Sequence, residues 1–110
     1  MKVLVRISSL VLVIVLGLIV SSTTARGQGD GAALFKAKCA PCHGADGKGQ
    51  TAMGKALKAR DLGSEEVQKE SDGQLTEIVN KGKGKMPAYK GKLTDAQIKE
   101  LVTFVRSLKK

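Results

Sequence analysis

The chain has 110 residues, with 19 Lys and Arg against 10 Asp and Glu, so its formal net charge at pH 7 is +9. This length allows one domain at most. With no Trp, one Tyr and two Phe, few large side chains are available for its core, so we expect another group to fill the centre. The positive charge does not indicate nucleic-acid binding, because there is no recognition motif and almost no aromatic content.

The N-terminus has the order of a secretory signal peptide. Lys2 and Arg6 are basic, residues 7–20 are almost all apolar, and residues 21–25 are small. The apolar run is shorter than the ~20 residues that a membrane-spanning helix needs. We therefore expect a signal peptide over residues 1–25 and a periplasmic domain over 26–110 without stable membrane contact. An uncleaved segment acting as a membrane anchor is the alternative.

The first half of this domain is predicted to contain a helix followed by loops. Asp30 is placed to cap a helix over residues 31–38 or 31–39. Pro41 does not suit a helix interior, so the helix should end or tighten there. Glycines indicate a loop over residues 44–49, and a short helical turn is expected around residues 55–58.

Three more helices are predicted in the second half. Ser64 precedes a short one, and the spacing of Ser71 and Gln74 is that of a capping box. A Gly- and Lys-rich loop over residues 81–92 follows. The clearest helix begins after Thr94, and its apolar stripe contains Ile98, Leu101, Val102, Val105 and Leu108. No segment has the period of a strand, so the domain is predicted to be all-α.

The segment Cys39-Ala40-Pro41-Cys42-His43 contains every cysteine and histidine of the chain. It has the attachment signature of a c-type haem, in which each thiol adds to one vinyl group and the imidazole meets the iron. A thiol–disulfide pair is one rival, but that chemistry is typical of a fold with strands. Zinc is another, but two Cys and one His supply only three ligands. His43 favours haem, because only haem attachment requires it.

The haem iron then takes a sixth ligand or keeps an open position, and because the chain has no second histidine the candidate ligands are Met53 and Met86. Met53 lies only ten residues after His43, a short reach around a porphyrin, and is expected to pack in the core. Met86 lies 43 residues after His43, beside Pro87 in a polar loop. We therefore predict His43 and Met86 as the axial ligands. A thioether ligand raises the reduction potential and closes the iron to substrate, which favours electron transfer over catalysis.

These motifs resemble those of a small class I (monohaem) cytochrome c of bacterial type, over residues 31–108. The matching residues are Gly31-x-x-x-Phe35, the motif at 39–43, Met86-Pro87-Ala88-Tyr89 and Leu101-x-x-Phe104. The resemblance implies the all-α cytochrome c fold, with three to five helices around one covalently bound heme c, and first and last helices that cross at the glycine. It also implies a monomeric one-electron carrier that is not an enzyme.

Two positions depart from the family pattern. Family members often have a proline after the motif whose carbonyl accepts from the ligand histidine, and Lys55 stands there in this chain. No Trp is available for a haem propionate, which leaves Arg60 and Tyr89 as candidates.

Lysines bracket Met86, and we expect them to form a positive collar that attracts redox partners with acidic docking surfaces. They are Lys81, Lys83, Lys85, Lys90 and Lys92. Two other functions stay open at this point. One is a haem peroxidase or ligand sensor with an open or labile sixth position. The other is a cytochrome subunit of a larger dehydrogenase or oxidase complex.

Overall fold

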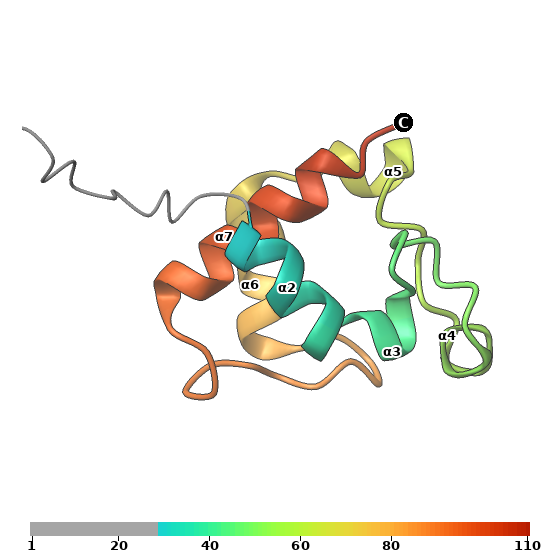
Figure 1. Cartoon of the computed structure of the whole chain (residues 1–110), viewed down its shortest axis with the longest axis horizontal. Helices are drawn as coiled ribbons and strands as arrows, with labels where there is room; N and C mark the ends of the chain where they lie inside the picture. The colour runs from blue at the N-terminus through green and yellow to red at the C-terminus, as the bar shows by residue number, and fades with distance from the viewer. Residues whose placement is uncertain (1–28) are drawn as a thin grey trace, which may run out of the picture.

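The computed structural model describes residues 29–110, so the predicted signal peptide lies outside the described residues. This part of the chain forms α2 (Gly29–Lys38), α3 (Ala40–His43), α4 (Ala52–Leu57), α5 (Glu65–Gln68), α6 (Asp72–Lys81) and α7 (Asp95–Ser107). Figure 1 shows α2 lying across α7, and the loop after α6 running toward the end of α2. None of the described helices is both long and apolar enough to cross a membrane.

The all-α prediction is confirmed for residues 29–110, which contain only isolated bridges in place of strands. The described helices number six, more than the three to five expected. The additional helix is α3, a separate turn of four residues, whereas the equally short α5 was expected after Ser64. Pro41 lies in α3, directly after the break that it was expected to cause.

Three of the six described helices begin at the polar residues that the sequence predicts. Ser71 and Thr94 each form a capping box with a glutamine three residues later. Ser64 caps α5 by accepting from the N–H of Val67. α2 differs, because it begins at Gly29 and places Asp30 in its first turn rather than at the cap. α3 has no side-chain cap, and α4 begins after Thr51, earlier than the turn expected around residues 55–58.

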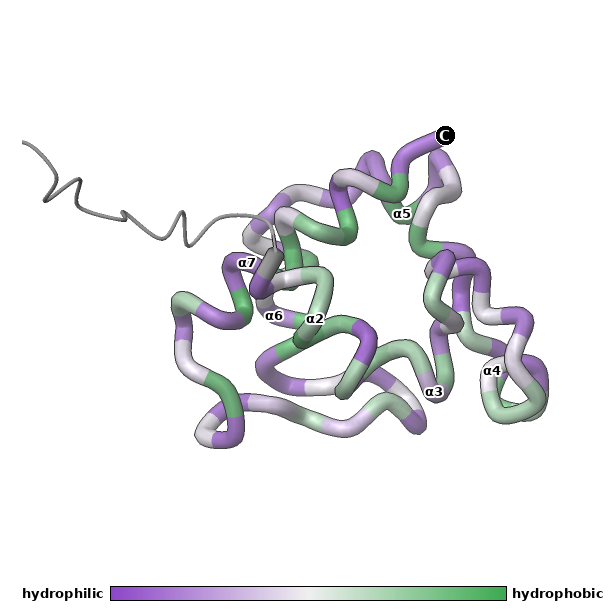
Figure 2. The backbone as a smooth tube through the Cα atoms, in the orientation of Figure 1, coloured by the Kyte–Doolittle hydropathy of each residue, from purple (hydrophilic) through white to green (hydrophobic). Residues whose placement is uncertain are grey.

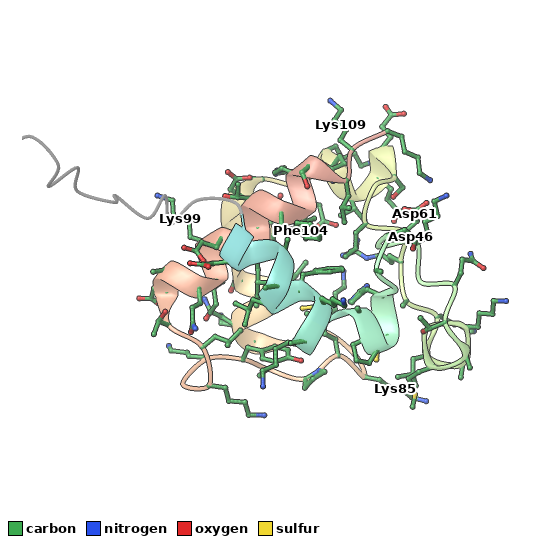
Figure 3. All side chains as sticks on the ribbon, in the orientation of Figure 1. Asp46, Asp61, Lys85, Lys99, Phe104 and Lys109 are labelled. Atoms are coloured by element: carbon green, nitrogen blue, oxygen red, sulfur yellow. The ribbon has the colours of Figure 1, made fainter. Side chains whose placement is uncertain are left out.

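The crossing of α2 and α7 depends on Gly31. A Cβ atom at this position would lie 2.5 Å from the carbonyl oxygen of Glu100, so a larger residue would force the helices apart. Next to this contact, the rings of Phe35 and Phe104 pack with their centroids 4.8 Å apart. Phe104 is labelled in Figure 3, beside α2. The predicted crossing at the glycine is confirmed.

The protein core is small. Val67, Leu75 and Val102 are buried together, with Leu62 and Val105 packed against them but only partly covered. Along α7, hydrophobic positions alternate with hydrophilic ones, as Figure 2 shows, so this helix buries one face only. The partly covered side chains border the cavity described next.

Candidate haem-binding site

A cavity of about 400 Å³ lies between the helices and the loop after α6. Cys39, Cys42 and His43 line it from the α2–α3 segment, and Met86 lines it from the loop. Half of the other lining residues are large aliphatic ones, namely Leu57, Leu62, Val67, Leu75, Ile78, Val79, Leu101, Val102 and Val105. The four site residues predicted from the sequence therefore share one apolar cavity.

The motif is held in place by its own turn and by α4. The N–H of His43 donates to the carbonyl of Cys39 at 2.9 Å. The hydroxyl of Thr51, at the start of α4, donates to the carbonyl of Cys42 at 2.8 Å. A Cβ atom on Gly54 would overlap that same carbonyl oxygen, so glycine is what lets α4 pack against the motif.

The surroundings of His43 favour its neutral form. Burial lowers the pKa of His43, the main chain of Arg60 raises it, and the Arg60 charge lowers it. Its Nδ1 is buried without a hydrogen-bond partner among the described residues. A neutral imidazole is the form that ligates a metal.

The segment near this imidazole is not the one that the sequence suggested. The main chain of Arg60 lies there, and not that of Lys55, which is exposed on α4. Lys58 explains the difference, because it ends α4 in the left-handed region with φ of 57° and turns the chain back. The N–H of Ala59 then donates to the carbonyl of Gly54 at 2.8 Å.

The two cysteines are free thiols, each half-buried. Burial raises the pKa of Cys39 to about 11, and the neighbouring Cys42 adds to the rise. Disulfide-exchange motifs depend on a lowered thiol pKa, so these surroundings disfavour that chemistry. The zinc alternative is also disfavoured, because no three His, Cys, Asp or Glu side chains come together within residues 29–110.

Met86 is half-buried in a tight turn that follows α6. Its N–H donates to the carbonyl of Lys83 at 3.0 Å, and its carbonyl accepts from the N–H of Lys83 at 3.3 Å. A Cβ atom on Gly82 would overlap the carbonyl oxygen of Met86, and Gly82 has φ of +73°. The turn therefore needs glycine at this position.

The expectation that Met53 packs in the core is wrong. Its side chain is 53% exposed. Gly54 is the buried residue of α4 and makes the contact with the motif, which leaves Met53 on the surface. Met53 does not line the cavity, whereas Met86 does.

The two propionate candidates both line the cavity, but each already has a partner. Arg60 forms an ion pair with Glu70 at 2.6 Å. The hydroxyl of Tyr89 donates to the carbonyl of Lys38 at 3.2 Å. Burial raises the pKa of Tyr89, and Cys39 and Cys42 add to the rise, so the phenol stays protonated at neutral pH.

The charged residues of the cavity wall are all cationic. Besides Arg60 they are Lys38, Lys58, Lys83 and Lys85, which we call the rim lysines. None of the rim lysines belongs to an ion pair within the described part of the chain.

The rim lysines only partly match the collar predicted from the sequence. Lys83 and Lys85 belong to both sets. Lys81 pairs with Glu77 at 2.6 Å instead, and Lys90 and Lys92 do not line the cavity. Lys38 and Lys58 were missed because they come from other elements; the only signal for Lys38 was its place directly before Cys39.

Comparison with known proteins agrees with this site. Residues 27–105 match the family described as "Cytochrome C oxidase, cbb3-type, subunit III". Cytochrome c6 of Leptolyngbya boryana is 40% identical over 75 residues, which cover 68% of this chain and 85% of that protein. The FixPc subunit of the cbb3-type oxidase of Rhizobium leguminosarum bv. viciae is 39% identical over 85 residues, but the match covers only 26% of its length.

A solved structure has the same fold. The KustC0563 c-type cytochrome is 41% identical and superposes with a TM-score of 0.69, covering 74% of this chain and 99% of that one. These matches define the class as c-type cytochromes, electron carriers with covalently attached haem c and iron. Within this class, the chain belongs to the cytochrome c family matched by the cbb3-type subunit III model, as a small monohaem member similar to cytochrome c6.

Proposed function

We propose that this protein is an exported, monomeric one-electron carrier. Its haem c is held by Cys39 and Cys42 and ligated by His43 and Met86. The observation that carries this proposal is that these four side chains line one aliphatic cavity. When bound, the haem iron alternates between ferric and ferrous forms, so it takes one electron from a reduced partner and passes one to an oxidised partner.

Each of these residues has a separate task. The two thiols would hold the haem through thioether bonds to its vinyl groups, and the neutral imidazole of His43 would ligate the iron. The thioether of Met86 favours ferrous iron and so raises the reduction potential. With His43 and Met86 both holding the iron, the site would leave no position for a substrate.

Replacing each methionine in turn tests the ligand assignment. We expect Met86→Ala to lower the reduction potential by on the order of 0.2 V, part of the ~0.8 V range that axial ligands span. Met53→Ala is the matched control and should leave the potential unchanged, because Met53 is exposed and outside the cavity. An unchanged potential in Met86→Ala would contradict the proposal, and a drop in Met53→Ala alone would make Met53 the ligand.

We also propose that the rim lysines attract acidic redox partners. They surround the cavity with positive charge, and the cavity wall has no acidic residue. Electrons pass most readily where the haem edge is nearest to the partner, so charge at the rim raises the rate of productive encounter.

The export proposal concerns the boundary between residues 25 and 26. A basic start, an apolar run and small residues support cleavage after Ala25. The intact mass of the protein isolated from its native periplasm should equal residues 26–110 plus one haem. A mass that includes residues 1–25 would contradict cleavage and support a membrane anchor.

A second candidate function is that of a cytochrome subunit in a larger oxidase complex. The family description and the match to FixPc favour it. Gentle purification from the native source separates the two candidates. Co-elution with a larger oxidase protein would support the subunit, and elution as a single small chain would support the free carrier.

A further inference from the structure

The last carbonyl of α2 lacks a main-chain donor. In a continuing helix, the carbonyl of Lys38 would accept from the N–H three or four residues later. The residue three positions later is Pro41, which has no N–H. The residue four positions later is Cys42, whose N–H donates to the carbonyl of Cys39 at 3.2 Å. The attachment motif therefore leaves the Lys38 carbonyl free.

The hydroxyl of Tyr89 supplies the missing hydrogen-bond donor. It donates to the Lys38 carbonyl at 3.2 Å, across 51 residues of sequence. This hydrogen bond joins the loop after α6 to the residue directly before Cys39. Figure 1 shows this loop running toward the end of α2.

The main chain of Tyr89 is fixed on both sides. Its N–H donates to the carbonyl of Val79 in α6 at 3.0 Å. Its carbonyl accepts from the N–H groups of Lys92 and Leu93 at 2.9 and 3.0 Å. The main chain that carries the phenol is therefore held in place by hydrogen bonds. Tyr89 lines the same cavity as Met86.

We propose that Tyr89 is a positioning residue for Met86, because its hydroxyl fastens the loop that carries Met86 to the segment that carries Cys39. The inference rests on the proposed ligation by Met86. Met86 lies between two attachments, the turn with Lys83 on one side and the Tyr89 hydroxyl three residues later on the other. Without the hydroxyl, the loop leaves the iron more often, and a competing ligand binds more tightly.

Imidazole titration of the oxidised holoprotein tests this role. Tyr89→Phe keeps the ring and removes only the hydroxyl. We expect imidazole, which displaces the Met86 thioether, to bind this variant about fivefold more tightly than the native protein. A fivefold change in affinity equals ~1 kcal/mol, the usual net contribution of one hydrogen bond. Loss of the red thioether-to-iron absorption band reports the displacement.

Thr103→Val is the matched control. The hydroxyl of Thr103 also donates to a main-chain carbonyl, that of Lys99 at 3.0 Å, but on the exposed face of α7. This variant should bind imidazole as the native protein does, even where its thermal stability falls.

Three results would overturn the inference, and each has a distinct meaning. Imidazole binding within about twofold of the native value in Tyr89→Phe would refute the positioning role, because a lost hydrogen bond changes affinity by more than this. An equal change in Thr103→Val would show a general loss of stability instead. If the native protein lacks the red band, or if Met86→Ala leaves imidazole affinity unchanged, the ligation by Met86 itself fails.

Discussion

Cys39 and Cys42 are the proposed attachment points of the haem. Their thiols are half-buried at the wall of an apolar cavity, and burial holds the pKa of Cys39 at about 11. The Cys39 thiol is therefore uncharged at neutral pH and poor at disulfide exchange. The proposed thioether bonds would remove the remaining reactivity of each thiol.

Replacing one or both cysteines tests the two attachment points separately. In Cys42→Ser, one vinyl group stays unsaturated and conjugated, so the reduced pyridine haemochrome band should move to longer wavelength, while the intact mass still includes haem. Cys39→Ser should behave alike, and the double variant should have the mass of the chain alone. Covalent haem in the double variant would contradict the assignment of both thiols.

At the level of residues, the sequence predicted the site residues but not their neighbours. Cys39, Cys42, His43 and Met86 were proposed from spacing and scarcity, and all four line one cavity. The approach of Arg60 to His43 was not found, because it depends on the left-handed turn at Lys58. A non-glycine residue in that region has no local sequence signature, since tertiary contacts select it.

Among the helices, the close approach of α2 and α7 fixes one wall of the cavity. The contact leaves no room for a Cβ atom at Gly31. We expect Gly31→Ala to lower the free energy of unfolding by about 1–3 kcal/mol, the usual cost of overpacking, as measured by denaturant titration.

Gly73→Ala provides the matched control for this prediction. Gly73 lies in α6, and a Cβ atom there would meet only Ser71 Oγ, at 3.8 Å. Alanine has the higher helix propensity, so this variant should be as stable as the native protein or up to ~1 kcal/mol more stable. Equal effects in the two variants would show that the α2–α7 contact is not what Gly31 provides.

The turn after α6 gives a second prediction at the level of elements. Gly82→Ala places a Cβ atom against the carbonyl of Met86 and forces alanine to a positive φ. Gly91→Ala, in the same loop, has the same backbone strain, with φ of +80°, but meets no atom within 4 Å. We expect Gly82→Ala to weaken or abolish the red thioether band, and Gly91→Ala to keep it.

If both glycine variants keep the full band, the turn does not control the position of Met86. If both lose it to the same extent, backbone strain alone explains the loss. The comparison thus isolates the contact between residue 82 and the carbonyl of Met86.

The starts of α5, α6 and α7 were predictable because capping is local. Ser64, Ser71 and Thr94 hold their caps through donors within three residues. The course of the loop after α6 was not predictable, because it depends on the hydrogen bond from Tyr89 to Lys38 across 51 residues. The exposure of Met53 was missed for the same reason, since it follows from how α4 packs on α3.

Over the whole molecule, positive charge is arranged around the cavity rather than along one loop. Lys38, Lys58, Lys83 and Lys85 line it from three separate parts of the chain. In Figure 3, Lys85 lies far from Lys99 and Lys109. Charge reversal at these positions therefore separates a local effect at the rim from an effect of net charge.

We expect Lys85→Glu to slow oxidation of the reduced protein by ferricyanide, an anionic oxidant, several-fold at low ionic strength, with the difference fading as salt screens the charges. Lys99→Glu changes the net charge equally and should have a much smaller effect. Stopped-flow rates over a range of ionic strength would check this. Equal slowing in both variants would contradict a role for the rim lysines.

The axial pair of His43 and Met86 is the central claim, and the absorption spectrum of the native holoprotein tests it most directly. The account predicts a red thioether-to-iron band in the oxidised protein, and reduced protein that does not bind carbon monoxide rapidly. Absence of the band together with rapid binding of carbon monoxide would contradict the account, because the iron would then have an open position suited to a peroxidase or a ligand sensor.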